Sequence, residues 1–136
     1  MRNDQRLCLY AMCLLASASV LGCGRASGPV RYRVSGTVTC AGRPVPHGEI
    51  LFSPDGSRGN TGPQGIAAIV NGRYDTAGTR APGTAGGPTV VRVTALESPR
   101  GGLIAEHEFT VKLPKEDSDR DIDIPAAAKA KQAPEI

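Results

Sequence analysis

Residues 103–113 read Leu-Ile-Ala-Glu-His-Glu-Phe-Thr-Val-Lys-Leu, and polar and apolar side chains alternate along this run. The polar face carries Glu106, Glu108, Thr110 and Lys112. The opposite face carries Ala105, His107, Phe109, Val111 and Leu113. Successive side chains of a β-strand point to opposite faces of its sheet. The pattern therefore predicts a strand with one face toward water and the other toward a core.

Shorter runs with the same period of two predict further strands at 31–40, 49–53, 65–70, 73–76, 89–96 and 121–124. Asn71-Gly72 predicts a type I′ turn that joins two of these strands as a hairpin, because both positions of that turn need a positive φ. No segment after the N-terminal region keeps a helical period. The sequence predicts an all-β fold over residues 31–124, a seven-stranded antiparallel β-sandwich with two sheets packed face to face.

Composition and charge agree with one small domain of short strands and frequent turns. The chain has 136 residues, of which 17 are Gly and 11 are Pro, and only 4% are aromatic. The net charge of +3 and the charged fraction of 21% are too mild for a nucleic-acid-binding protein. No nucleic-acid partner is therefore expected.

The N-terminal segment has the layout of a secretory signal. Arg2 and Arg6 make a basic start, and residues 7–21 form an almost wholly apolar run. This run is short for a transmembrane helix, which needs about 20 apolar residues. Residues 1–22 are therefore predicted to be a helical signal segment.

Val20-Leu21-Gly22-Cys23 ends this segment and resembles the lipobox of bacterial lipoproteins. The resemblance implies cleavage before Cys23, acylation of that residue by chains such as palmitate, and anchoring in membrane lipid. Residues 23–30 would then be a lipidated tether. An Asp after the acylated Cys resembles an inner-membrane retention signal, and Gly24 in that place slightly favours the outer membrane. The alternative is an ordinary signal cut near Ala26.

Cleavage and acylation of the chain would leave one cysteine with a free thiol. Cys8 and Cys13 would leave with the signal, and Cys23 would be acylated. Cys40 falls on the apolar face of the run 31–40, so it is predicted to be a small buried hydrophobic residue. No internal disulfide is expected.

Several motifs occur in an order that resembles a known family. They are Val34-Ser-Gly-Thr-Val38, Gly42-Arg-Pro-Val-Pro46, Gly48-Glu-Ile-Leu-Phe52, Asn71-Gly-Arg-Tyr74 and Val90-Val-Arg-Val93. This order is similar to the carboxypeptidase regulatory-like domain, a transthyretin-like or prealbumin-type β-sandwich found in small bacterial lipoproteins. The resemblance covers about residues 32–113. It implies a transthyretin- or immunoglobulin-like sandwich without catalytic residues of its own, although His47 departs from the small residue usual after Pro46.

No constellation in the sequence indicates an enzyme, a cofactor or a zinc site. His47 and His107 are the only imidazoles, and they lack the spacing of zinc ligands. The Gly-rich residues 55–65 have no Gly-Lys-Ser/Thr, and no Gly-x-Ser-x-Gly occurs. The acidic run 116–123 predicts either a solvated turn before an edge strand or a calcium site.

The sequence thus predicts a lipoprotein anchored through Cys23 in the bacterial cell envelope, and a non-catalytic binding or structural module. An envelope protein or polysaccharide would be its partner, contacted through the loops 54–64 and 77–87. Residues 125–136 are predicted to be a disordered tail. The alternative is a secreted, non-acylated, carbohydrate- or calcium-binding β-sandwich. Its calcium site would need Asp119, Asp121 and Asp123 to converge.

Overall fold

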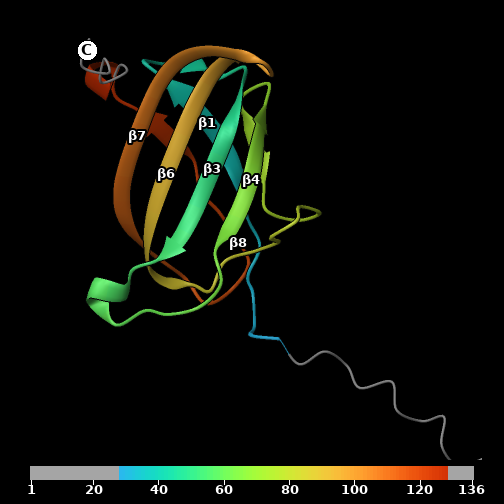
Figure 1. Ribbon diagram of the computed structural model, residues 1–136, viewed down its shortest axis with the longest axis vertical. Helices are drawn as coiled ribbons and strands as arrows, with labels where there is room; N and C mark the ends of the chain where they lie inside the picture. The colour runs from blue at the N-terminus through green and yellow to red at the C-terminus, as the bar shows by residue number, and fades with distance from the viewer. Residues whose placement is uncertain (1–27, 129–136) are drawn as a thin grey trace, which may run out of the picture.

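The computed structural model describes residues 28–128 (Figure 1). The predicted signal segment and Cys23 lie outside these residues, as do residues 129–136. The described part is mostly β, with two short 3₁₀ helices, Gly56–Arg58 and Ala126–Ala128 (η3). Its strands are β1 (Val34–Cys40), β2 (Arg43–Pro44), β3 (His47–Pro54), β4 (Gly65–Val70), β5 (Arg73–Asp75), β6 (Gly87–Ser98), β7 (Gly101–Leu113), β8 (Ser118–Asp119) and β9 (Ile122–Ile124). Each predicted strand has a counterpart, and β2 and β8 are additional.

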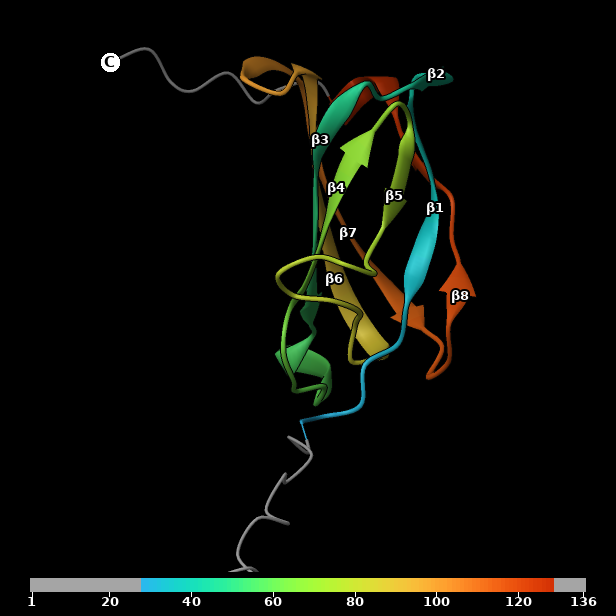
Figure 2. The ribbon, with the colours of Figure 1, turned by 90° about the vertical axis from the view of Figure 1, so that its right-hand side faces the viewer.

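The strands form one nine-stranded sheet rather than two separate sheets. Its order is β2-β1-β5-β4-β3-β6-β7, with all these neighbours antiparallel. The sheet curls over, so that β1 and β5 face β3 and β6 across the core (Figure 2). The β4–β5 hairpin keeps the two layers hydrogen-bonded, through the pairs Ile69–Tyr74 and Val70–Arg73. This hairpin is the reason why the expected separation into two sheets does not occur.

The last strands pair in parallel with the first one, which the expectation of a wholly antiparallel fold did not include. Val34 is opposite Ser118 in β8, and Val38 is opposite Ile122 in β9. The C-terminal strands therefore cover the edge of β1 that β5 leaves open. The chain then ends its described part in η3, where Ala128 packs against the core.

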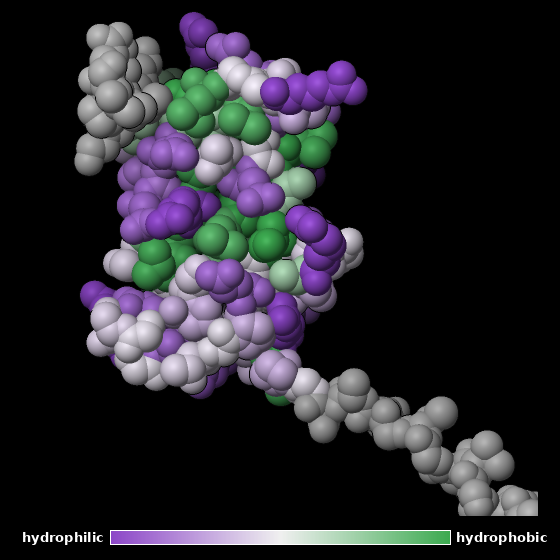
Figure 3. Space-filling model, in the orientation of Figure 1, coloured by the Kyte–Doolittle hydropathy of each residue, from purple (hydrophilic) through white to green (hydrophobic). Residues whose placement is uncertain are grey.

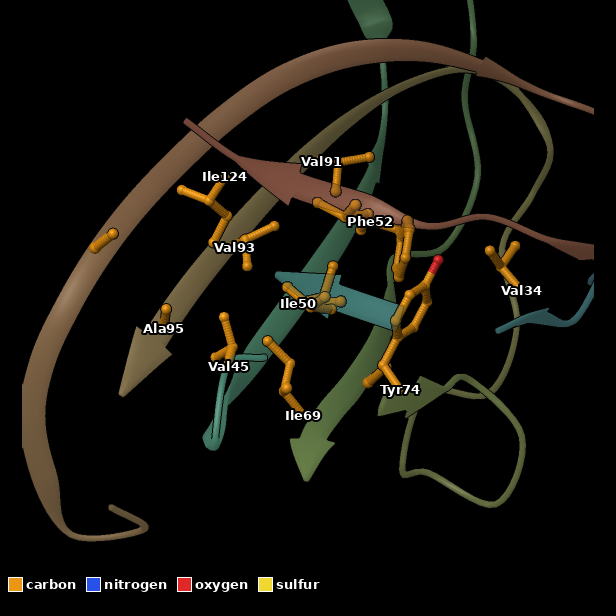
Figure 4. Packing of buried hydrophobic residues seen from close by; sticks show 14 of the residues in the cluster. Val34, Val45, Ile50, Phe52, Ile69, Tyr74, Val91, Val93, Ala95 and Ile124 are labelled. Atoms are coloured by element: carbon orange, nitrogen blue, oxygen red, sulfur yellow. The ribbon is translucent and has the colours of Figure 1, made fainter. Parts of the chain in front are cut away.

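The core lies between the two layers and is built from alternate residues of the strands (Figure 4). Its largest side chains that are nearly inaccessible to solvent include Phe52, Ile50, Ile69, Leu113, Ile124, Val34, Val38, Val91 and Val93. Burying each such side chain contributes roughly 1.5–3 kcal/mol. The rings of Phe52 and Tyr74 pack with their centroids 6.1 Å apart. The predicted period of two thus selects the side of each strand that faces the core, and on that side Cys40, His107, Phe109 and Val111 are only half-buried.

Two tight turns have left-handed backbone at both central positions. Asn71 and Gly72 have φ values of 50° and 73°, which confirms the predicted type I′ hairpin turn. Ala41 and Gly42, with φ values of 50° and 78°, join β1 to β2 in the same way. The sequence predicts a turn over residues 41–48, but not a tight one at Ala41 and Gly42, because alanine rarely adopts positive φ.

The alternation in β7 is regular only from Ala105 onward. Ala95 is opposite Ala105, but the next residue, Leu96, is opposite Leu103. This bulge inserts Ile104, which packs against the core, and leaves Leu103 46% exposed. From Ala105 to Leu113 the predicted polar face is exposed as expected. The outer face of the sheet over β3, β4 and β6 carries both apolar and polar side chains (Figure 3).

Candidate binding groove

An open groove of about 710 Å³ lies on the outer face of β1, β4 and β5. β1 supplies Ser35 and Thr37 to it, because Val34 and Val38 turn to the core and leave the odd positions outside. The other polar side chains that line it are Arg33, Arg73, Asp75, Thr79, Asp119 and Asp121. The groove therefore gathers guanidinium groups, carboxylates and hydroxyls in one concave surface.

A two-pronged ion pair lines the groove and joins the start of β1 to the end of β5. The guanidinium of Arg33 donates from Nε to Oδ1 of Asp75 at 2.9 Å and from Nη2 to Oδ2 at 2.5 Å. Asp75 also accepts the backbone N–H of Ala77 at 2.8 Å. These contacts, the hydrogen bond from Arg33 first, lower the pKa of Asp75 to about 2. The pair is therefore charged at neutral pH and fixes one wall of the groove.

Asp119 and Asp121 form the other wall, as part of a longer row of hydroxyl–carboxylate hydrogen bonds along β1. The hydroxyl of Ser35 bonds Asp119, and Thr39 Oγ1 donates to Asp123 at 2.8 Å. Between them, Asp121 Oδ1 accepts both the backbone N–H of Thr37, at 2.9 Å, and its hydroxyl, at 2.8 Å. These bonds lower the pKa of Asp121. Asp117 continues the row by accepting the backbone N–H of Arg33 at 2.8 Å.

The acidic run follows an exposed bend at 115–116 into β8 and β9, which pair only with β1, in agreement with the predicted solvated turn before an edge strand. The sequence did not predict that its carboxylates bond β1 one after another. Asp119, Asp121 and Asp123 do not converge as a calcium site requires. Within residues 28–128, no three carboxylate, imidazole or thiol groups come together in a way that could hold a metal ion.

A close backbone contact underlies the row. The carbonyl oxygen of Arg120 lies over Gly36, where a Cβ atom would meet it at only 2.2 Å. The buried hydroxyl of Tyr74 donates to this same carbonyl at 2.5 Å. Figure 4 shows the Tyr74 oxygen directed toward the ribbon that carries Ile124. Glycine at position 36 and tyrosine at position 74 therefore let the C-terminal strand approach β1 closely enough for its carboxylates to bond.

The predicted loops 54–64 and 77–87 are tied together at one end of the molecule. Asp55 is buried and caps the helix Gly56–Arg58 through the N–H of Ser57. The side chain of Asn60 then donates to the carbonyls of Gly86, at 2.8 Å, and Pro88, at 2.6 Å. These bonds hold the two loops together, and Thr79 of the second loop lines the groove.

The remaining residues singled out from the sequence lie apart from the groove. Cys40 is half-buried at the end of β1 and packs against the core with a free thiol. His47 begins β3 on its outer face, opposite Leu96. His107 lies half-buried in β7, stacked on Phe109 with ring centroids 5.4 Å apart. The two imidazoles are therefore on opposite faces of the sheet and form no joint site.

Sequence reasoning missed Arg33, Arg73 and Asp75 as members of a site. The sequence held one signal for this site. Two segments each have a polar side chain at every second position, and the two rows could have been aligned with each other. One is Ser35, Thr37 and Thr39, and the other is the Asp series of 117–123, with each partner 84 residues further on.

Within residues 28–128, no helix is long and apolar enough to cross a membrane. Comparisons with protein-family models, with curated proteins and with solved structures find no match for this chain.

Proposed function

We propose that this chain is a lipoprotein of the bacterial cell envelope, anchored through Cys23, whose β-domain is a non-catalytic binding module. The anchor rests on the sequence Val20-Leu21-Gly22-Cys23, with the outer membrane slightly favoured by Gly24. A chain carrying several acyl groups stays on a bilayer, whereas a single acyl chain binds only marginally.

The anchor would give the domain a defined orientation. Arg31 donates to the carbonyls of Gln64, at 3.2 Å, and Pro82, at 3.0 Å, so the chain enters the domain at the end that carries both Gly-rich loops. The residues from Cys23 to Arg31 can span at most about 28 Å. In this proposal the loop end lies near the membrane, and the groove lies on the flank of the domain, open along the strands.

The groove is the observation that carries the binding proposal. Its donors, among them Arg33 and Arg73, are interleaved with the acceptors Asp75, Asp119 and Asp121. A surface with both charges closely mixed does not select an ion, but it suits a neutral ligand rich in hydroxyls, which donate and accept equally. Its volume of about 710 Å³ fits several sugar units. The proposed ligand is therefore an envelope polysaccharide.

We assign the curled sheet to the carboxypeptidase regulatory-like type of β-sandwich as part of the same proposal. Several residues of the motifs that carry this resemblance make specific structural contacts in this protein. Gly36 leaves space for the Arg120 carbonyl, and a Cβ on Gly48 would meet the Thr94 carbonyl oxygen at 2.1 Å. Tyr74 bonds the final strand segment. These contacts support a non-catalytic scaffold in which glycine and tyrosine serve packing.

Sedimentation with purified peptidoglycan sacculi tests the binding proposal. The purified protein should pellet with sacculi, and Arg73→Ser should reduce the bound fraction at least threefold. Arg73 is exposed in the groove and forms no ion pair among the described residues. Arg100→Ser is the matched control, because Arg100 lies in the turn between β6 and β7, outside the groove. Equal binding by the two variants, or none by the wild type, would contradict the proposal.

A further inference from the structure

The curled sheet ends on one side in a long strand, β7, which η3 contacts but beside which no further strand of residues 28–128 is paired. Within the described residues, β7 pairs only with β6. A gap of about 300 Å³, lined by His107 and Phe109 on one side and by residues 120–123 on the other, separates β7 from the C-terminal strands. From Ala105 to Leu113, β7 therefore presents an open edge, which is a template for another strand.

The backbone groups at this edge can be assigned from those of β6. The carbonyl of Pro88 accepts the N–H of Asp55 at 2.9 Å, and the carbonyl of Thr94 approaches Gly48. The backbone N–H and C=O groups of the even residues of β6 therefore point toward β3. Hydrogen-bonding groups alternate along antiparallel strands, so the odd residues of β6 and β7 bond each other. The N–H and C=O groups of the even residues in 106–112 then point to the open edge.

The side chains of this edge complement a second copy of themselves. In an antiparallel pair of β7 strands centred on Phe109, Glu106 of each copy lies opposite Lys112 of the other, and Glu108 lies opposite Thr110. All four are even residues, so their backbone groups can form the hydrogen-bonded pairs of such a ladder. The half-buried Phe109 meets its own counterpart on the inner face. Opposite charges and aromatic pairs across strands are stabilising, whereas a pairing centred on Glu108 would bring like charges together.

We propose that two copies of this chain associate through antiparallel pairing of their β7 edges, centred on Phe109, to form one continuous sheet across the dimer. The stretch that pairs is the regular part of β7. It is bounded by the bulge before Ala105 at one end and by Pro114, which has no N–H, at the other. This association uses a different part of the molecule from the groove.

Carbodiimide coupling of the unmodified full chain, in membranes of a bacterium that expresses it, tests the pairing. The reagent joins a carboxylate to a lysine amine that contacts it. Glu106 and Lys112 of one chain are about 20 Å apart along an extended strand, so a Glu106–Lys112 link can form only between copies. The expected product is a dimer in which mass spectrometry finds this link. Lys112→Arg keeps the charge but cannot couple, and should lose it.

Cysteine variants test the register. Phe109→Cys should give a disulfide-linked dimer on mild oxidation, because the two positions face each other on the two-fold axis. Thr110→Cys should give no more dimer than the wild-type chain, because its two copies are offset diagonally beyond disulfide reach. A monomer after carbodiimide treatment, or dimers linked only through other residues, would overturn the proposal. Cross-linking by Thr110→Cys instead of Phe109→Cys would overturn the register.

Discussion

The hydroxyl of Tyr74 donates to the backbone carbonyl of Arg120 at 2.5 Å, across 46 positions of sequence. The bond joins β5 to the segment between β8 and β9, so it holds the C-terminal strands on β1. Burial of the ring raises the pKa of Tyr74, so the phenol remains a donor at any physiological pH. The acidic wall of the groove depends on this contact, because Asp119 and Asp121 flank Arg120.

Tyr74→Phe should destabilise the protein by about 1–3 kcal/mol, because a carbonyl in a part-buried contact is left without its donor. Denaturant unfolding measures the loss. Tyr32→Phe is the matched control, since the Tyr32 hydroxyl has no hydrogen bond within residues 28–128, and it should change the stability by less than about 0.5 kcal/mol. Equal effects of the two substitutions would refute the role given to Tyr74.

Gly36→Ala should displace the last strands, because its Cβ would lie 2.2 Å from the Arg120 carbonyl oxygen. We expect a loss of about 1–3 kcal/mol or more, as for other overpacked sites. Faster hydrogen exchange of the amides in 118–124 would locate the change. Gly56→Ala is the control, because its Cβ would meet nothing within 4 Å. Unchanged exchange in 118–124 would contradict the close approach.

Asn60→Ala should loosen both Gly-rich loops at once, because the side chain bonds carbonyls on either side of Gly87. The expected loss is about 1–3 kcal/mol, the cost of leaving the part-buried carbonyl of Gly86 without its donor, whereas Pro88 keeps the N–H of Asp55. Hydrogen exchange should rise in 55–65 and in 83–88. Arg58→Ala, in the same loop but with its side chain 63% exposed, should leave exchange in 83–88 unchanged. A rise confined to the first loop would show that Asn60 does not join the two.

Asp75→Asn should change how stability depends on pH. The pKa of Asp75 is lowered from 3.8 to about 2 in the folded protein, mainly by the hydrogen bond from Arg33. A lowered folded-state pKa contributes stability that is fully present above the unfolded pKa and is lost as the pH falls through the folded one. The stability difference between wild type and variant should therefore be constant above about pH 5 and shrink toward pH 2.

Unfolding midpoints measured from pH 7 to pH 2 check this expectation. Both side chains of the pair are substantially exposed, so salt should weaken the effect. In an Arg33→Gln background, the pH-dependent part of the Asp75→Asn effect should become smaller. A difference that stays constant down to pH 2 would show that the ion pair adds nothing to stability.

Local pattern explains which parts of the fold could be predicted. Alternation placed the strands and selected the buried residues, because one side of each strand must face a core. Asn71-Gly72 fixed the hairpin through backbone sterics alone. Pairing over long separations left no local signal, so neither the parallel contact of β1 with β8 and β9 nor the continuity of the sheet followed from the sequence.

The site was harder to predict for the same reason. Arg33 and Asp75 lie 42 positions apart, and only the β1–β5 register brings them together. The acidic run suggested calcium because its spacing is visible in sequence, whereas its partners Ser35, Thr37 and Thr39 lie 84 positions earlier. The Gly-rich composition of 54–64 concealed the helix cap made by Asp55 and the bonds that Asn60 makes to the second loop. Acylation of Cys23 stays a prediction from the lipobox resemblance.

The most direct test of the account is the intact mass of the protein isolated from bacterial membranes, beside a Cys23→Ser variant. The account predicts a chain that begins at Cys23 and carries added acyl mass, which the variant lacks. A soluble, unmodified chain that begins near Ala26 would contradict the lipid anchor, and the domain would then act as a secreted protein.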